Sequence, residues 1–191
     1  MAPELHGAAA SCRLEWAAGP LQEEALDREI YGHSATVAGR TVWVLGGIHG
    51  RARHPISAHT FQLDERRWDD LTDTVASSGH RPAPCRRWGH SACLVAERGA
   101  PDRVLLCGGF DSKCNHSDVW FLDTAACTFA RPAREMRHVP VHGAYHSLVF
   151  DEARGKAMLF GGQCCIGGPY EFYDSVYVAD ARGGGGWVEL P

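Results

Sequence analysis

One pattern occurs three times along this chain and constrains its fold more than any other feature. Each copy contains, in the same order, a histidine followed by serine, an apolar run ending in two glycines, a second apolar run and a closing aromatic residue. The histidines are 57 and 56 positions apart, the glycine pairs 62 and 53, and the closing aromatics 61 and 58. The residues are His33, His90 and His146; Gly46, Gly47, Gly108, Gly109, Gly161 and Gly162; and Trp68, Phe129 and Trp187. A long period with short apolar runs is typical of blade-type repeats and not of helical solenoids.

Each copy also contains four short segments that predict strands. In the first copy they lie near residues 33–38, 41–45, 58–63 and 67–71, are rich in Val, Trp, Phe and Leu, and are separated by turn residues. Short connections favour an antiparallel meander, because antiparallel neighbours need no crossover helix. Each copy therefore predicts one four-stranded antiparallel sheet.

The sequence GHSA at 32–35 and again at 89–92, the three double glycines and the late tryptophan resemble the repeats of the kelch family. The resemblance implies an all-β fold, a kelch-type β-propeller with three four-stranded antiparallel blades plus one N-terminal strand. Propellers typically close with four to eight blades, so this one is expected to be incomplete. The predicted units are 1–30, an N-terminal tail with a strand of an incomplete blade and a linker; 31–84, kelch repeat 1; 85–140, kelch repeat 2; and 141–191, kelch repeat 3.

Three blades leave apolar blade faces and sheet edges that need covering. We expect the chain to be a piece of a longer propeller protein. Two alternatives remain: self-association of two copies into a six-bladed ring, and completion by another protein.

Structural roles account for the repeated residues. The glycine pairs end the second strand, where the chain turns closely against a neighbour, and glycine allows both a positive φ and a close backbone approach. The histidines and the adjacent serines are expected to be buried and to bond to backbone within each blade. Three copies in register argue against a catalytic site, which needs one convergent set. The closing aromatics are predicted to lie between blades.

Composition excludes several other functions. The net charge of −4 offers no basic footprint for nucleic acid, and no apolar run approaches the ~20 residues of a membrane span. The N-terminal residues lack the pattern of a signal peptide, and the eight cysteines show no framework spacing. We therefore expect reduced cysteines in a cytoplasmic protein.

The loops after each second strand (48–57, 110–116 and 163–173) and those between blades are predicted to share one face. They gather arginine and aromatic side chains, which protein interfaces favour, and an acidic segment would complement them. The predicted partner-binding residues are Arg51, Arg53, His54, Arg86, Arg87, Lys113, Tyr170, Phe172 and Tyr173. For Arg87 alone, the kelch resemblance also implies ligand contact.

The favoured function is a non-enzymatic protein–protein interaction module, a scaffold or adaptor with no cofactor and no metal. The carboxylates are scattered on turns without a motif that couples an acid to a base, which disfavours the alternative of a propeller enzyme. A second alternative is a zinc site on the same loops, although no Cys-x-x-Cys spacing supports it. Its candidate ligands are His49, His54, Cys114, His116, Cys164 and Cys165.

Overall fold

The computed structural model describes residues 30–48, 55–77, 83–97, 99–133, 136–140, 143–164, 169, 171–182 and 185–191. The predicted N-terminal strand lies outside these residues. Within the described residues, no helix combines the length and the apolar character needed to cross a bilayer.

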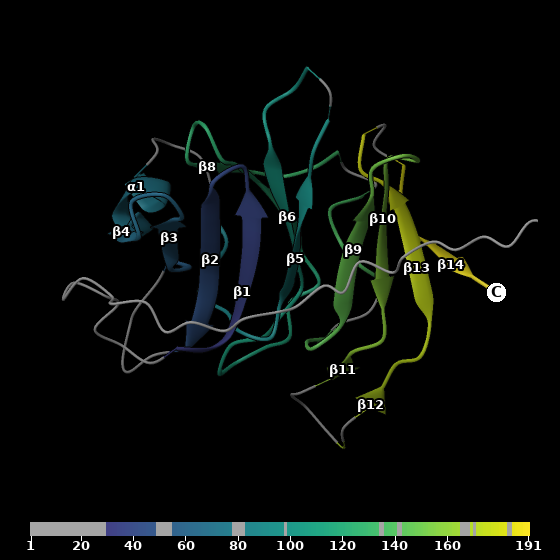
Figure 1. Ribbon diagram of the computed structural model, residues 1–191. Coiled ribbons are helices and arrows are strands. Elements are labelled where there is room, and N and C mark those ends of the chain that lie inside the picture. The colour runs from purple at the N-terminus through teal and green to yellow at the C-terminus, as the bar shows by residue number, and fades with distance from the viewer. Residues whose placement is uncertain are drawn as a thin grey trace, which may run out of the picture.

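Three four-stranded antiparallel sheets stand side by side in chain order (Figure 1). The first, blade 1, contains β1 (Tyr31–Ala38), β2 (Thr41–Ile48), β3 (Ala58–Gln62) and β4 (Arg67–Asp70). Blade 2 contains β5 (Ser91–Val95), β6 (Arg103–Cys107), β7 (Val119–Asp123) and β8 (Thr128–Ala130). Blade 3 contains β9 (Ser147–Asp151), β10 (Lys156–Phe160), β13 (Val176–Asp180) and β14 (Val188–Leu190). The predicted all-β fold, a partial propeller of antiparallel blades, is confirmed.

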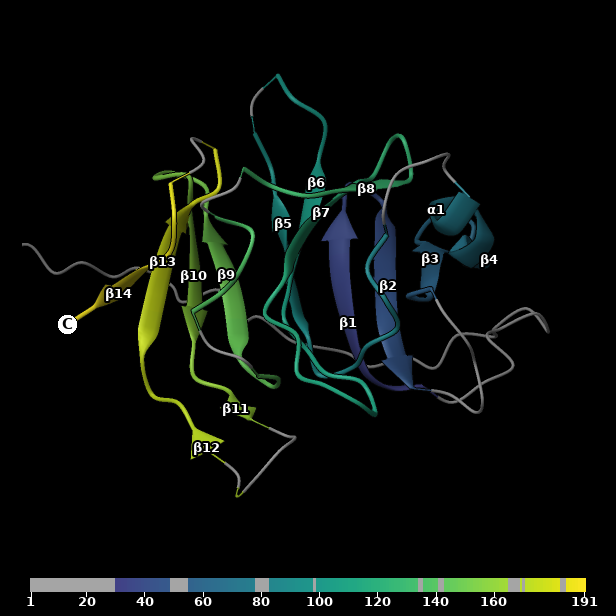
Figure 2. The same cartoon turned by 180° about the vertical axis from the view of Figure 1, so that it is seen from behind.

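Two elements were not predicted because they lie in connections that the sequence pattern marks only as long loops. One is the short helix α1 (Thr72–Ser77), visible from behind in Figure 2. It begins where Asp70 Oδ1 accepts a hydrogen bond from Thr72 N at 2.9 Å, and it buries Val75. The other is the hairpin of β11 (Gln163–Cys164) and β12 (Glu171–Phe172), which projects below blade 3 in both views.

Two hydrophobic clusters fill the spaces between the blades. One joins blades 1 and 2 and includes Val104 and Leu106; the other joins blades 2 and 3 and includes Leu105 and Cys107. These four residues are consecutive on β6, and successive side chains of a strand point to opposite faces. Blade 2 is therefore covered on both faces by its neighbours.

The glycine pairs lie where neighbouring repeats approach most closely. All six glycines have positive φ, for example 63° at Gly46 and 62° at Gly108. A Cβ atom on Gly46 would lie 2.6 Å from the His90 ring, and one on Gly108 would lie 2.6 Å from the His146 ring. The first glycine of these pairs thus leaves room for the histidine of the next repeat.

Those histidines bond between repeats. The Ser34 hydroxyl lies 2.9 Å from His90 Nε2, and the Ser91 hydroxyl lies 2.7 Å from His146 Nδ1. The prediction that histidine and serine bond to backbone within one blade is therefore wrong for these pairs, because each serine reaches the histidine of the following blade. Burial lowers the pKa of His90 to about 3 and that of His146 to about 4. His33, with no preceding repeat among the described residues, is exposed.

The closing aromatics differ in burial. Phe129 is 1% exposed and meets Trp120 edge to face, with ring centroids 6.3 Å apart. Trp187 is half-buried against the cluster between blades 2 and 3, and Trp68 is half-buried against Phe61. Among the three, only Phe129 is fully enclosed between blades.

Candidate functional site

The loops on one end of the three blades form the candidate site. In each blade the first strand starts and the second strand ends at this end, as the pairs Ser91 with Cys107 and Ser147 with Phe160 show. We call this end the loop face; it carries the connections after β2, β6 and β10 and those that lead into β5 and β9. It lies at the bottom of Figure 1, where β11 and β12 project.

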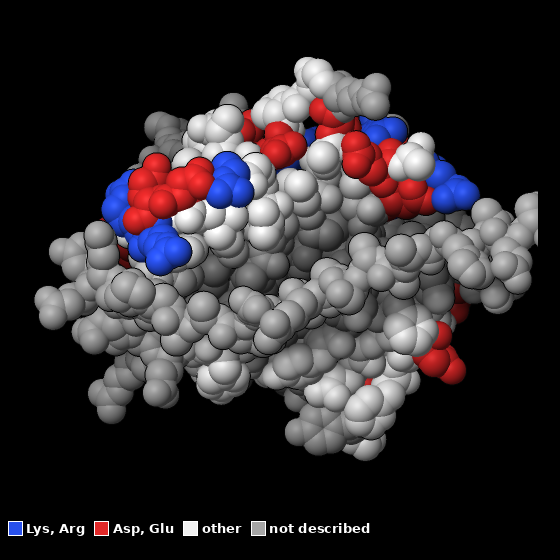
Figure 3. Space-filling model, in the orientation of Figure 1, with Lys and Arg blue, Asp and Glu red and all other residues white. Residues whose placement is uncertain are grey.

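The opposite end of the blades is highly charged. Figure 3 shows Lys, Arg, Asp and Glu side chains gathered along the upper edge of the molecule. Many of them pair with one another, including Arg154 with Asp151 within a turn at 2.7 Å and Lys156 with Asp180 across two neighbouring strands at 3.0 Å. Charges that neutralise each other locally offer little to a partner, so we place the site on the loop face.

Three aromatic side chains form a continuous row on the loop face. The ring centroids of Trp88 and Phe110 are 4.7 Å apart, and those of Phe110 and Tyr145 are 5.8 Å apart. The Arg86 guanidinium lies 5.8 Å from the Trp88 ring centroid, within range of a cation–π interaction. Trp88 is largely buried, whereas Tyr145 is 53% exposed. We call Trp88, Phe110 and Tyr145 the aromatic row.

Tyr145 has an unusual backbone conformation. It has φ of 60° and precedes the third histidine, a position that Gly32 and Gly89 occupy in the first two repeats with φ of 68° and 64°. Its N–H donates to the Gly89 carbonyl at 2.7 Å, which holds the chain in this turn. A left-handed conformation costs an L-residue roughly 1–2 kcal/mol relative to glycine. Backbone strain of this kind tends to occur at functional sites.

A hollow of about 320 Å³ adjoins the exposed end of the aromatic row. Its wall includes Tyr145, Ser147, Phe160, Gln163, Phe172 and Tyr173. Phe172, which is 76% exposed, lines the hollow from β12, whereas Ser147 and Phe160 line it from blade 3. An apolar side chain of a partner fits such a space.

The prediction that Arg87 contacts a partner is wrong, because its side chain is 0% exposed. Its guanidinium donates to the Gly108 carbonyl at 3.0 Å and to the Cys85 carbonyl at 3.1 Å, and it forms a paired bond with the Asp118 carboxylate. Burial opposes its charge, but the hydrogen bonds and charge of Asp118 outweigh burial and raise the pKa of Arg87. The residue therefore stabilises the interior between repeats.

The other predicted contact residues divide into two groups. Lys113 and Phe172 are exposed on the loop face, and Arg86 and Tyr173 are half-buried there. Arg51, Arg53, His54 and Tyr170 lie outside the described residues. Sequence reasoning missed the aromatic row, although one signal marked it: a tyrosine stands where the other two repeats have glycine.

The alternative metal site changes its membership in the structure. Cys114 and His116, which were predicted, lie close together. Their neighbours are Cys85 and Asp111, which were not among the predicted ligands. Cys164 instead accepts a hydrogen bond from Asn115 Nδ2 at 3.2 Å. His49, His54 and Cys165 lie outside the described residues.

Three stacked antiparallel blades with glycine pairs and inter-blade histidines define a β-propeller repeat protein. The chain belongs to the kelch-repeat family: residues 32–190 match the family described as the KLHDC2/KLHL20/DRC7 Kelch-repeats domain. Kelch domain-containing protein 3 of Bos taurus is 26% identical over 175 residues, 84% of this chain and 40% of that protein.

Two Arabidopsis thaliana proteins match shorter stretches. Serine/threonine-protein phosphatase BSL2 is 35% identical over 96 residues, 49% of this chain and 8% of that protein. Acyl-CoA-binding domain-containing protein 4 is 31% identical over 104 residues, 54% of this chain and 14% of that protein. The chain thus spans less than half the length of these relatives. The family identifies a protein-interaction module.

Proposed function

We propose that the chain is a non-enzymatic scaffold or adaptor of the cytoplasm that binds one segment of a protein partner on the loop face. The observation that carries this proposal is the exposed Tyr145 at positive φ, where the other repeats have glycine. Its side chain joins the aromatic row to the hollow beside Phe172. Aromatic anchors next to a concave surface are what dominates the energy of many protein interfaces.

The charges at this surface favour an acidic partner segment. The Arg86 guanidinium lies beside the Trp88 ring, and Lys113 is exposed in the short hairpin that follows β6, where Phe110 pairs with Asn115. A guanidinium oriented by an aromatic ring loses less entropy when it binds a carboxylate in bidentate fashion. The segment we expect therefore carries an apolar side chain for the hollow and a carboxylate near Arg86.

Selection from a library of random peptides displayed on phage tests this function without a known partner. We expect acidic peptides with an apolar anchor to be enriched, and their binding to fall tenfold or more in Tyr145→Gly and in Arg86→Glu, a loss of about 1.4 kcal/mol or more. Arg154→Glu, at the charged end, is the matched control and leaves binding unchanged. If no peptide is enriched, or if Tyr145→Gly and Arg86→Glu bind the peptides as well as the parent does, the proposal is contradicted.

Folding of the Tyr145 variants separates lost binding from lost structure. Tyr145→Gly relieves the backbone strain, whereas Tyr145→Ala keeps it and also removes the ring. We expect the glycine variant to be more stable than the alanine variant by about 1 kcal/mol in urea denaturation, while both lose the peptide. Loss of binding together with unfolding would remove Tyr145 as evidence for a site.

A further inference from the structure

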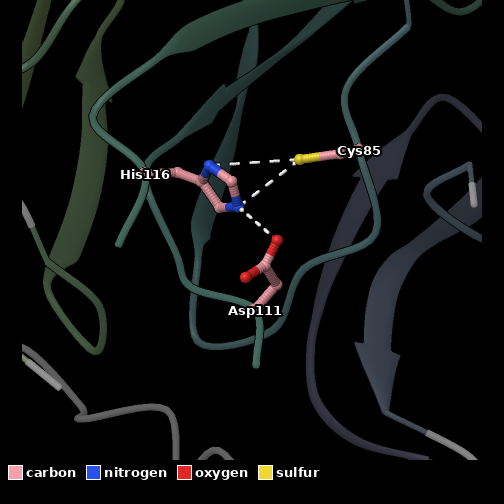
Figure 4. Close-up of side chains that lie close together, drawn as sticks. All are labelled: Cys85, Asp111 and His116. Carbon is pink, nitrogen blue, oxygen red and sulfur yellow. Dashed lines mark hydrogen bonds and ion pairs between the residues drawn. The ribbon is translucent and has the colours of Figure 1, made fainter. Parts of the chain in front are cut away.

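A group of metal-ligating side chains lies on the loop face beside the aromatic row. Figure 4 shows Cys85, Asp111 and His116 pointing toward one another from two separate loops. Their ligand atoms all lie within 4.8 Å of one another. The Cys85 sulfur is 3.4 Å from His116 Nε2, and Asp111 Oδ2 is 3.3 Å from the same nitrogen.

These separations match those of ligands around one zinc ion. With a Zn–S bond of about 2.3 Å and Zn–N and Zn–O bonds of about 2.0–2.2 Å, tetrahedral angles place sulfur ~3.6 Å from nitrogen and nitrogen ~3.4 Å from oxygen. The two distances in the structure, 3.4 Å and 3.3 Å, are within about 0.2 Å of these values. The third separation, between the Cys85 sulfur and the Asp111 carboxylate, is at most 4.8 Å, so adjustment of the side chains would let one ion reach all three.

The local hydrogen bonds hold Asp111 and His116 in place without occupying Asp111 Oδ2. Asp111 Oδ1 accepts hydrogen bonds from the backbone N–H groups of Lys113, at 2.6 Å, and Cys114, at 2.9 Å, which fixes the hairpin. The other carboxylate oxygen, Oδ2, turns toward His116. The backbone N–H of His116 donates to the Gly109 carbonyl at 2.7 Å. The backbone is therefore held in place at both ligands of this hairpin.

A fourth ligand is close by. The Cys114 sulfur lies 3.9 Å from His116 Nδ1 and 4.0 Å from Nε2, and its side chain is exposed. Cys114 lies outside the group of three, so a rotation about its side-chain bonds is needed to bring its sulfur into a tetrahedral set. Structural zinc sites are usually closed by four protein ligands, and sulfur and imidazole are the donors that zinc favours.

The charge of the surroundings suits a divalent ion. The Arg87 guanidinium donates to the Cys85 sulfur at 3.3 Å, and Asp118 neutralises that guanidinium. The bound ion would bring two positive charges to the carboxylate of Asp111 and to the sulfurs of Cys85 and Cys114, which bind a metal as thiolates, so the ligands would carry three negative charges in all. The side chains of Asp111 and His116 are only 17% and 13% exposed, which shields such a site from competing water.

We propose that Cys85, Asp111 and His116 bind a zinc ion, with Cys114 as the fourth ligand. The ion would join the connection that leads into blade 2 to the hairpin that follows β6. Trp88 lies three residues after Cys85, and Lys113 lies within that hairpin, so the metal holds two parts of the candidate binding surface in a fixed relation. Binding to the folded chain also stabilises it.

Metal content of the untagged, full chain tests the site. Protein purified under reducing conditions is exposed to a slight excess of zinc, desalted and measured by mass spectrometry of the native protein. We expect about one zinc per chain in the parent and in Cys127→Ser, a matched variant whose sulfur lies in the β7–β8 turn, away from the site. Cys85→Ser and Asp111→Asn are expected to lose the ion; asparagine keeps the oxygen that fixes the hairpin.

A second measurement identifies the ligands. Cobalt in place of zinc should give thiolate-to-metal charge-transfer absorption that weakens in Cys114→Ser and disappears in the double variant with Cys85→Ser. Chelation should lower the melting temperature of the parent and of Cys127→Ser but not that of Cys85→Ser. The proposal is overturned if the parent holds no zinc or if the parent and Cys85→Ser hold equal amounts of zinc. It is also overturned if Cys85 and Cys114 form a disulfide in the reduced preparation.

Discussion

Blade 2 and blade 3 are built from the same repeat, yet their two faces are used differently. On β6 of blade 2, consecutive residues are buried on both faces, with Leu105 and Leu106 each 0% exposed. On β10 of blade 3, Leu159 is 0% exposed toward blade 2, while its neighbour Phe160 is 54% exposed. The exposed face continues across the sheet through Val149 and Val188. An apolar blade face is thus buried only where a neighbouring blade packs against it.

The difference extends to the polar residues. Asp118 of blade 2 forms the buried pair with Arg87, whereas Ser175 stands at the same place in blade 3, as the backbone bonds to Gly108 and Gly161 show. Gly143 is the residue of the third repeat that corresponds to Arg87. A Cβ atom at this position would lie 2.4 Å from the Gln163 carbonyl oxygen. The repeat between two neighbours therefore has a buried ion pair that the third repeat cannot accommodate.

The largest expected effect comes from breaking this pair. Asp118→Ala leaves the Arg87 charge buried without its partner and removes the acceptor of the Trp120 indole N–H, at 2.7 Å. We expect the free energy of unfolding to fall by about 3–5 kcal/mol in chemical denaturation. Ser175→Ala, the matched change in blade 3, should cost less than about 1 kcal/mol, because its bond to Glu189 is exposed.

Replacing both partners tests the cause. If the loss arises from an orphaned charge, Arg87→Met combined with Asp118→Ala is more stable than Asp118→Ala alone. A double variant that is less stable than either single variant would show that packing of the two side chains, and not their charge, supports the interior.

The repeat pattern was enough to predict the sheets, because glycine pairs and alternating apolar residues report local turns and strands. It could not place Arg87, since an arginine on a loop has the same local sequence whether it is exposed or buried against an aspartate 31 positions away. Two of the proposed zinc ligands, Cys85 and Asp111, were missed for a related reason: they come from different loops and belong to no short motif. Tyr145 was detectable by aligning the repeats, but its backbone conformation became evident only beside Gly32 and Gly89.

Substitution of two adjacent residues on β10 sharpens the comparison of the two faces. Leu159→Ala opens a cavity against blade 2 and is expected to cost about 2–5 kcal/mol. Phe160→Ala, on the open face, should cost less than about 1 kcal/mol in dilute protein. Urea denaturation at low concentration, with mass measured by light scattering, gives both values.

The same two variants test self-association. If two copies close a six-bladed ring, the mass doubles from 20.8 kDa as concentration rises and the cost of Phe160→Ala grows with it. A constant single mass with an unchanged cost contradicts closure by a second copy and favours completion within a longer chain. Equal costs for the two residues in dilute protein would contradict the assignment of an open face.

Acidification tests the contribution of the two buried histidines. Burial, followed by the charges of Arg87, His146 and His33, lowers the pKa of His90 to about 3, and burial lowers that of His146 to about 4. In the unfolded chain both titrate near 6.5, so below that pH the unfolded state binds more protons and stability falls as the pH decreases. Between pH 7.5 and 5, each histidine should remove about 2 kcal/mol from the free energy of unfolding.

Glutamine variants assign this loss to particular repeats. His90→Gln should flatten the dependence of stability on pH between 6.5 and 5, whatever its effect at pH 7.5, because glutamine has no proton to gain. His146→Gln should reduce the same slope by a similar amount, because burial lowers the pKa of His146 to about 4. Asp118 does not change the slope in this range. Burial raises its pKa, but the hydrogen bonds and charge of Arg87 outweigh burial and keep the pKa below the ordinary value, so its stabilising contribution is lost only under more acidic conditions. A His90 variant that keeps the slope of the parent would mean that protonation of the buried ring does not cause the loss of stability.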